Sequence, residues 1–480
     1  MQSKTTDAAP VIDLSGLTVG EISACLLTQL RDNNKVYARE GRLCRVTQYG
    51  VEDLNIHSLA LALGDAHYHH GKSRRLQDWM LKAVLEDENC GEYVQHLDAV
   101  SRVPILEPDG SVQHIEGYSY RTRRYHIIDD TLVALYETRP PNRAQAEDAL
   151  KCLLALIEDT PFEDQERGRS CWVAYVLAIF SRHLYSRSPL FLFDGNEPGG
   201  GKTILMTMGG AIHSGKWGPV NNLPSSEEEF EKRIPQFFNR SEPFVLFDEV
   251  RHLNGAGLKS VLTSEMMQGR VLGTNKLFHV KNTKVLAATG NNVGLEGDMR
   301  RRTIRIGVMK PPTQVQYRIR DIESHVLDNR NDLFSAAITI LQWALTTKEA
   351  RPDIPVFPSF EEFSRLVREP LVLLGMPDPY IANDESVHTD ADDTKEAVAD
   401  FVDALFALGT EFKGSDIAEY LNDQSEPLWA YRGLFWAKSS APLDSRTVGK
   451  VLGQHLNKHL PNGKILKRRS LHGYSVYTLA

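Results

Sequence analysis

Residues 188–203 read SPLFLFDGNEPGGGKT, and this stretch decides the fold class. Its apolar half, 188–193, has the composition of a buried strand, and residues 204–212 continue with a composition typical of a helix. A strand, a glycine-rich loop, Lys-Thr and a helix together form the context that a phosphate-binding loop requires. Consecutive glycines let backbone N–H groups close around phosphate oxygens, and the start of the helix adds partial positive charge. The stretch therefore predicts an α/β fold around a nucleotide site.

The side chains that close this loop predict how the nucleotide is held. Lys202 is expected to reach the β- and γ-phosphates of ATP, and the Thr203 hydroxyl to ligate Mg²⁺. The pattern G-x-x-x-x-G-K-[ST] places its first glycine at position 196, where this chain has Asn196 and carries the glycine one place earlier, at Gly195. Asparagine tolerates left-handed backbone conformations better than most residues, so we expect the loop to persist. The alternative is a glycine-rich turn beside an unrelated Lys-Thr pair. Further loop residues expected to bind the nucleotide are Glu197, Pro198, Gly199, Gly200 and Gly201.

A second apolar strand, PFVLFDE at 243–249, ends in two carboxylates. Asp248 is expected to bind the nucleotide by holding the Mg²⁺ shell together with Thr203. Glu249 is expected to orient and deprotonate the attacking water, which makes it the catalytic base. The alternative is a buried strand whose terminal charges are only solvated.

A third strand, 283–288, precedes the sequence Thr-Gly-Asn-Asn at 289–292. A polar amide at a strand end can hydrogen-bond both the γ-phosphate and the attacking water. We therefore predict a sensor role for Asn291, with Asn292 as the second choice. A turn built on Gly-Asn chemistry is the alternative.

Three adjacent arginines follow within GDMRRRT, at 297–303. Arginine offers a rigid, permanently charged fork for the charge that develops on a transferring phosphoryl group. Arg302, and after it Arg301, is expected to act on the ATP of a neighbouring subunit. A solvated surface cluster is the alternative.

Composition places the chain among ordinary globular proteins. Hydrophobic residues make up 41% of the 480 residues and charged residues 25%, with a net charge of −8, so the chain as a whole is not a general binder of polyanions. No apolar run approaches the roughly 20 residues of a membrane span, and the N-terminus lacks the apolar core of a signal peptide. We expect a cytoplasmic protein that does not contact a membrane. Five cysteines without CxxC spacing favour reduced thiols over disulfides or a zinc site.

Changes in composition predict five regions along the chain. A linker is expected between the fourth and fifth regions, because residues 383–393 are acidic and polar. The predicted regions are an N-terminal α+β domain at 1–140, a helical collar at 141–187, the phosphate-loop ATPase core at 188–312, a helical lid at 313–385 and a C-terminal winged-helix domain at 394–480.

The order of these motifs resembles that of superfamily 3 and related AAA+ helicases, above all the replication helicases of phages, plasmids and other mobile elements. The resemblance lies in FLFDGNEPG at 191–199, in TGNNVGLEGDMRRR at 289–302 and, upstream, in PDGS at 108–111 and EGYSYRT at 116–122. Ser119 departs from the family, in which an aspartate often follows Gly-Tyr. The likeness covers about 100–380 reasonably and the last 90 or so residues loosely. It implies a hexameric ring that uses ATP and Mg²⁺ to move along DNA.

Two segments are candidates for DNA contact. Residues 270–280 are expected to form a hairpin with its tip at 273–276, and similar helicases place a DNA-gripping hairpin there. We predict that Lys276 at the tip grips DNA, supported by His279 and Lys281; an ordinary surface hairpin is the alternative. Residues 445–480 contain seven Lys or Arg and no Asp or Glu.

This basic segment reads as a helix at 445–459 followed by a two-stranded wing, which is a winged-helix pattern. The helix could enter a major groove while the wing contacts phosphates. A basic protein-docking module is the alternative. The residues predicted to bind DNA here are Arg446, Lys450, Lys467, Arg468 and Arg469.

Taken together, these patterns predict an ATP-dependent DNA helicase or translocase that acts as a homo-oligomeric ring, with a hexamer expected, in the replication of a mobile element. Single-stranded or forked DNA would be its partner, and a separate primase or initiator could join it. Two alternatives stay open. One is a non-helicase ATPase switch, such as a loader or a regulator of transposition or defence. The other is a DNA-binding replication initiator.

Overall fold

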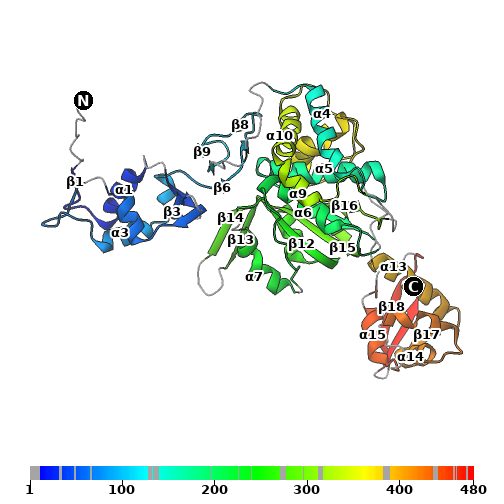
Figure 1. Ribbon diagram of the computed structural model, residues 1–480. Helices are drawn as coiled ribbons and strands as arrows, with labels where there is room; N and C mark the ends of the chain where they lie inside the picture. Colours follow the sequence, from blue (N-terminus) through cyan, green and yellow to red (C-terminus); the bar gives the residue numbers. More distant parts are fainter. Residues whose placement is uncertain are drawn as a thin grey trace. The chain divides into compact units, whose positions relative to one another are not determined.

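The computed structural model describes residues 11–479 of the chain, with gaps (Figure 1). Contacts divide the chain into two compact units. The gaps are 32–34, 40, 48–49, 65–66, 128–131, 133–139, 196, 225, 239–240, 271–276, 296, 312–316, 382–389, 436–441, 454, 458–459, 461 and 472–473. The first unit comprises Met1–Val250, Gly255–Asn291 and Arg301–Asn383, and the second comprises Arg251–Asn254, Asn292–Arg300 and Asp384–Ala480.

The first unit begins with small helices and short strands around their own apolar cluster. Helix α1 starts where Thr18 accepts a hydrogen bond from the backbone of Glu21 and the Glu21 side chain accepts one in return, an arrangement that satisfies backbone donors left open at a helix start. Its apolar stripe, including Ile22, Leu26 and Leu30, is fully buried. The elements are β1 (Val11–Asp13), α1 (Val19–Leu30), β2 (Val36–Arg39), β3 (Arg42–Thr47), β4 (Gly50–Asp53), α2 (Ile56–Ala62), β5 (His67–His69), α3 (Asp78–Leu85) and η1 (Cys90–Glu92).

A strip of very short strands follows, and it packs on the large helical and sheet core. Leu106 belongs to the apolar cluster of that core, its carbonyl oxygen lies 2.8 Å from His183 Nε2, and Gln342 donates to the carbonyl oxygen of Gly110. The strands are β6 (Ala99–Ser101), β7 (Ile105–Leu106), β8 (Val112–Gln113), β9 (Gly117–Ser119) and β10 (Arg124–His126), with β10 between β6 and β9.

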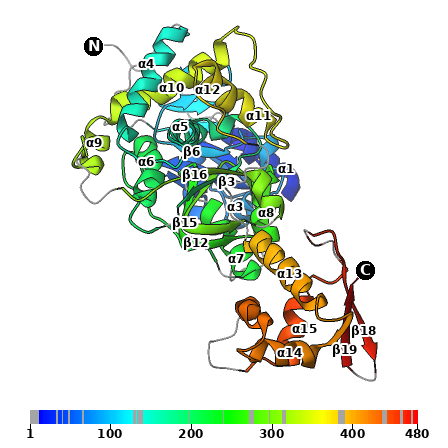
Figure 2. The same cartoon turned by 90° about the vertical axis from the view of Figure 1, so that its right-hand side faces the viewer.

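Helices before and after the central sheet form one layer of the first unit. Helix α5 is buried on every side from Ser170 to Ser181, as expected of an apolar helix inside a core. It contacts α4, α6, α10 and β16 (Figure 2). The elements of this layer are α4 (Arg143–Leu154), η2 (Ala155–Ile157), α5 (Gln165–Ser181), η3 (Arg182–Leu184), α9 (Ile322–Asp328), α10 (Arg330–Thr346), α11 (Glu361–Phe363), η5 (Ser364–Arg368) and α12 (Glu369–Leu373).

The central sheet has the strand order β12-β15-β11-β16. Strand β11 pairs in parallel with both β15 and β16, and all five of its residues are buried, as is usual for parallel strands covered on both faces. The α/β prediction with a parallel sheet is therefore confirmed. The elements are β11 (Leu190–Asp194), α6 (Lys202–Ser214), α7 (Glu227–Phe238), β12 (Phe244–Leu253), α8 (Ala256–Thr263), β13 (Met266–Arg270), β14 (Leu277–Lys281), β15 (Val285–Leu295), η4 (Gly297–Arg302) and β16 (Thr303–Gly307).

Residues 390–479 of the second unit form a small mixed domain around a separate apolar cluster. The helix predicted at 445–459 is shorter than expected: α15 ends at Gly453, where glycine favours termination, and Asn457 adopts a left-handed φ of 58°. The elements are α13 (Asp390–Phe406), β17 (Glu411–Lys413), α14 (Gly414–Asn422), η6 (Pro427–Phe435), α15 (Ser445–Gly453), β18 (Leu466–Leu471) and β19 (Tyr474–Leu479), with an antiparallel sheet ordered β17-β19-β18.

Candidate functional site

The strand order brings three predicted motifs to one edge of the sheet. Strands β11 and β15 are parallel neighbours, and β15 also lies next to β12, although β12 comes before β15 in the chain. Because β15 lies between β11 and β12 in the sheet, the chain skips one strand position when it passes from β11 to β12. In open α/β sheets, ligands bind beyond the carboxyl ends of strands at such crossings. The loop after β11, the acids of β12 and the amides of β15 meet there.

Lys202 is the first residue of α6 and lies at the centre of this edge. Its Nζ donates to Asn291 Oδ1 and to the carbonyl oxygen of Glu197, both at 2.8 Å. The side chain is 7% exposed, and this burial lowers the pKa of its ammonium group although Asp194 favours the charged form. The helix starts from Gly201 with φ 81°, a left-handed conformation that glycine adopts without strain. The loop thus presents a cation together with the open end of a helix.

A second group of contacts surrounds Asp248. Its Oδ1 accepts hydrogen bonds from Thr203 Oγ1 at 3.0 Å, from Thr289 Oγ1 and from the backbone N–H of Glu249 at 3.1 Å. The hydroxyl and carboxylate predicted to hold Mg²⁺ are therefore adjacent. Thr289 was not among the predicted site residues, although it follows the third apolar strand directly.

Glu249 differs from its neighbours in its backbone and its exposure. Its φ is 54°, a conformation that costs a non-glycine residue of the order of 1–3 kcal/mol, and its backbone N–H donates to Thr289 Oγ1 at 3.2 Å. The side chain is exposed, and its carboxylate makes no hydrogen bond or ion pair with any residue that the structure describes. The strained backbone thus turns an accessible carboxylate out from the end of the buried part of β12.

A buried ion network supports the start of the loop, and sequence reasoning missed it. Arg305 on β16 donates from Nε to Asp194 Oδ2 at 3.0 Å and from Nη1 and Nη2 to the two oxygens of Glu163, at 2.6 and 2.9 Å. Burial lowers the pKa of Arg305, but the pairs with Glu163 and Asp194 outweigh burial and raise it. A charged residue within an apolar strand needs a partner, so Arg305 within TIRIG was the available signal.

The two predicted arginine fingers occupy different environments. Arg301 is exposed. Arg302 is partly buried and donates from Nη1 to the carbonyl oxygen of Lys259 at 2.8 Å and to Thr263 Oγ1 at 3.3 Å. Arg302 thus contacts helix α8 of its own chain, while the Arg301 side chain faces solvent.

The glycine loop also borders a pocket of about 340 Å³. Gly199, Gly200 and Gly201 line one side of it. Apolar or aromatic side chains on α6 and on the segment after 316 line much of the rest, among them Ile204, Leu205, Met208, Tyr317 and Ile319. Leu156, Asp159, Thr160, Pro161 and Arg320 also line it. Glu197, on the other flank of the loop, pairs with Lys310 at 3.2 Å. Asn196 lies outside the described residues.

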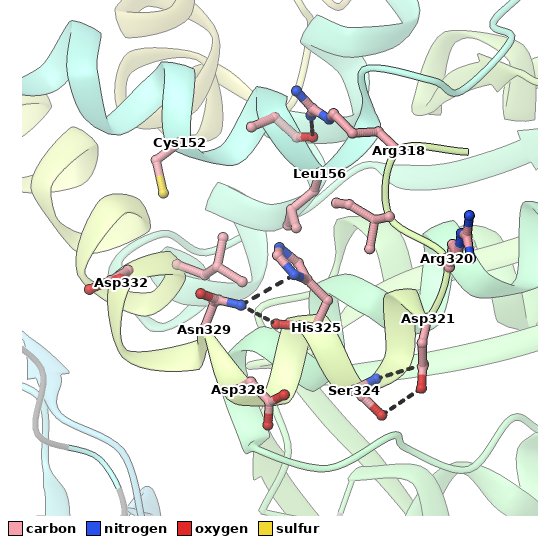
Figure 3. A pocket seen from close by; sticks show the side chains of 13 residues that line it. Cys152, Leu156, Arg318, Arg320, Asp321, Ser324, His325, Asp328, Asn329 and Asp332 are labelled. Carbon is pink, nitrogen blue, oxygen red and sulfur yellow. Dashed lines mark hydrogen bonds between the residues drawn. The ribbon is translucent and has the colours of Figure 1, made fainter. Parts of the chain in front are cut away.

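A larger hollow of about 850 Å³ lies beside this pocket and shares Leu156, Ile319 and Arg320 with it. Figure 3 shows that some of its polar side chains are joined by hydrogen bonds, whereas those of Arg320, Asp328 and Asp332 are not joined to another residue drawn. Asp321 accepts hydrogen bonds from Ser324. Asn329 donates from Nδ2 to the carbonyl oxygen of His325 and also lies 3.3 Å from His325 Nδ1.

The residues predicted to bind DNA fall into two groups. Strands β13 and β14 form the expected antiparallel hairpin, with Arg270 opposite Leu277. Lys276 lies outside the described residues, as does the side chain of His279. Lys281 lies at the foot of the hairpin and contributes to lowering the pKa of His183.

In the C-terminal domain, all five predicted basic residues are exposed. Lys467, Arg468 and Arg469 follow one another on β18, and Arg446 and Lys450 lie on α15. Arg469 pairs with both carboxylate oxygens of Glu411, at 2.6 and 2.7 Å. That pair must open or be shared before Arg469 can contact a phosphate.

No protein family and no curated protein matches the sequence. Among solved structures, the apo C-terminal region of NrS-1 is similar with a TM-score of 0.40 and 12% identity, over 96% of this chain and 98% of that chain. The SCCmec type IV Cch active helicase has a TM-score of 0.34 and 11% identity, over 91% of this chain and 90% of that chain. JCV helicase has a TM-score of 0.22 and 14% identity, over 50% of this chain and 69% of that chain. Helicases thus occur among the structural neighbours, at low similarity.

Proposed function

We propose that this chain hydrolyses Mg²⁺-bound ATP and uses the energy to move along or unwind DNA, as a ring-shaped oligomer that serves the replication of a mobile element. One observation carries the proposal: Lys202 is hydrogen-bonded to Asn291 and the adjacent Thr203 to Asp248, so that side chains from three separate segments meet at one edge of the sheet. A triphosphate is the ligand that best suits a lysine, a helix start and a magnesium-type hydroxyl-carboxylate pair together.

The start of the loop also passes very close to a neighbouring segment of the chain. At Gly195, an added Cβ would lie 2.3 Å from the carbonyl oxygen of Val308, so only glycine lets the loop pass this close to its neighbour. Lys202 would exchange its contacts with Glu197 and Asn291 for phosphate oxygens. Thr203 and Asp248 would hold Mg²⁺, which when bound offsets the negative charge of the phosphates.

The remaining groups of the site suit hydrolysis. Glu249 presents an exposed carboxylate that can take a proton from water. Asn291 is already oriented by Lys202 and can hydrogen-bond the water and the terminal phosphate. Arg301 is exposed and is our first candidate to act on the ATP of a neighbouring subunit, because Arg302 is partly buried and bonded to α8.

The pocket beside the glycine loop is our proposed site for the adenine base. Ile204, Leu205 and Met208 offer an apolar wall, and Tyr317 offers a ring on which a base can stack. Its volume of about 340 Å³ lies within the range of small-molecule sites, roughly 300–1,000 Å³.

DNA contact is proposed for two places. The C-terminal domain carries a helix, α15, and an antiparallel strand pair, β18 and β19, with exposed basic side chains on both. This arrangement supports the winged-helix hypothesis, in which α15 enters a major groove and β18 contacts phosphates. The hairpin of β13 and β14 would bring Lys276 to the DNA inside a ring.

The test measures ATP hydrolysis and strand separation by the full chain. We expect single-stranded DNA to accelerate ATP hydrolysis and forked DNA to be unwound. Lys202→Ala should abolish ATP binding, and Lys276→Ala should abolish unwinding while ATP binding persists. Lys151→Ala, an exposed lysine on α4, serves as the matched control and should retain both activities.

Other outcomes would decide for the alternatives. Hydrolysis that ignores DNA and separates no strands would indicate an ATPase switch, such as a loader or regulator. Replication activity that survives Lys202→Ala would indicate an initiator whose ATPase core is a scaffold. Folded protein that binds no ATP would overturn the proposal.

A further inference from the structure

A second polar pocket of about 370 Å³ lies in the first unit, away from Lys202. It is lined by the residues just before β12, by the end of α6, by η3 and by strands β6 and β10. Helix α6 begins at the phosphate loop and ends at this pocket. Because the lining residues at 241–243 precede β12, whereas Asp248 lies farther along that strand, the pocket belongs to the opposite edge of the sheet.

The most unusual residue of this pocket is Arg124, in the middle strand of its three-stranded sheet. Side chains alternate between the two faces of a strand. Tyr125 packs into the cluster that contains Tyr37 and Cys44, and Arg124 lines the pocket on the other face. Arg124 is only 6% exposed. A guanidinium at this depth normally has a carboxylate or carbonyl partner, because an unpaired buried charge is strongly unfavourable.

Arg124 has no such partner. Among the residues that the structure describes, none accepts a hydrogen bond from its guanidinium, and Asp98 acts on it only through longer-range attraction. Burial consequently lowers its pKa to about 10. Its five N–H groups are therefore available to a ligand in the pocket.

Two imidazoles lie beside Arg124, and of these His213 can offer a ring N–H to a ligand, whereas the free Nδ1 of neutral His183 is an acceptor. Nε2 of His183 donates to the carbonyl oxygen of Leu106 at 2.8 Å, which leaves Nδ1 on the other side of the ring. Nδ1 of His213 is buried and has no hydrogen-bond partner among the described residues. Burial lowers the pKa of both histidines to about 3, helped for His183 by Arg124 and for His213 by Arg330 and Arg124. Both rings are neutral at pH 7, so the fixed charge comes from the basic side chains.

The charges around the pocket are mostly positive. Arg102, Arg124 and Lys216 line it, and Glu242 is the one carboxylate among its described lining residues. Glu242 lies 3.4 Å from Lys216, to which it is paired. Deep within the wall, Arg182 donates to backbone carbonyl oxygens. The pocket therefore presents surplus positive charge inside a partly closed space.

We propose that this pocket binds the phosphate group of a small molecule, either inorganic phosphate or a phosphate monoester, with Arg124 as its principal ligand. The planar guanidinium fork matches two phosphate oxygens, and a volume of about 370 Å³ suits a small ligand. Phosphates within a continuous DNA backbone do not fit, because their neighbours on both sides would have to enter the pocket to reach a side chain that is 6% exposed. The site does not depend on the proposed ATPase.

The test is calorimetric titration of the full chain with inorganic phosphate at constant ionic strength. Every protein carries Lys202→Ala, so that phosphate binding at the glycine loop is removed. We expect one phosphate per chain, at least about tenfold weaker binding in Arg124→Leu, and an intermediate loss in Arg124→Lys, which keeps the charge without the fork. Lys216→Ala, at the exposed rim of the pocket, should weaken phosphate binding a few-fold. This variant keeps the proposal testable if the Arg124 variants do not fold.

Further titrations distinguish the sources of the phosphate. Ribose 5-phosphate is compared with ribose, and a single-stranded oligonucleotide is compared with and without a 5′-phosphate. Binding of phosphate or ribose 5-phosphate that depends on Arg124 and Lys216 supports the proposal. Whichever of these two ligands binds more tightly shows whether the pocket prefers inorganic phosphate or a phosphate monoester. The absence of phosphate binding in the Lys202→Ala protein overturns it. Equal affinity in Arg124→Leu, or binding only of DNA whatever its 5′ end, also overturns it.

Discussion

Replacing Arg305 by methionine removes the cation that joins β16 to the start of the phosphate loop. Asp194, which is 1% exposed, would remain buried without its ion-pair partner, whereas Glu163, at 33%, can regain water. Breaking a buried pair by removing one partner costs roughly 3–5 kcal/mol. At about 1.3 °C per kcal/mol for a unit of about 370 residues, the melting temperature of the first unit should fall by roughly 4–6 °C.

Scanning calorimetry of the full chain measures this shift, and a fluorescent ATP analogue reports the affinity of the loop that follows Asp194. The matched control is Lys151→Met, because Lys151 forms an exposed pair with Asp148 at 2.8 Å and such pairs are worth about 0–1 kcal/mol. The double variant Asp194→Asn with Arg305→Met should recover at least half of the loss, since the buried carboxylate that lost its arginine is then neutral. A single-variant shift no larger than that of the control would refute the role of the network.

Three further predictions concern the nucleotide site itself. Glu249→Gln should keep ATP binding but slow hydrolysis by about 10²–10⁴-fold, because the proton acceptor is lost; single-turnover phosphate release measures this, and an undiminished rate would exclude Glu249 as the base. Asn291→Ala should slow ATP hydrolysis, whereas Asn292→Gly, which preserves a left-handed φ of 48°, should hydrolyse ATP within about twofold of the wild-type rate. A slow Asn292→Gly variant beside an unaffected Asn291→Ala variant would assign the sensor role to Asn292 instead. Gly195→Ala should weaken ATP binding in equilibrium titration, because its Cβ would lie 2.3 Å from a backbone oxygen; unchanged affinity would show that the loop adapts.

The sequence alone predicted the local parts of this site. The apolar run before Asp194, the glycines after it and the acids that end the run at 243–249 each follow from short-range composition. Backbone preferences and burial decide such elements over a few residues, so the strands and α6 could be placed before any contact was known. The same reasoning failed at the described residues 455–457, because a helical apolar stripe does not show where Gly453 ends the helix.

The long-range relations were decided only by the tertiary structure. Nothing local places β15 between β11 and β12, yet this order is what sets Asn291 against Lys202 at 2.8 Å.

The tertiary structure alone also decided that Arg305 pairs with Asp194 and that the Arg124 guanidinium lines a pocket without a hydrogen-bond partner among the described residues. Each depends on segments more than 50 residues apart in the chain. The sequence by itself therefore determined which functional side chains this protein carries and on which local helices, strands and loops they lie. Only the pairing of distant strands, which is set by the total burial of apolar surface and hydrogen-bonding groups, decided which of those groups meet.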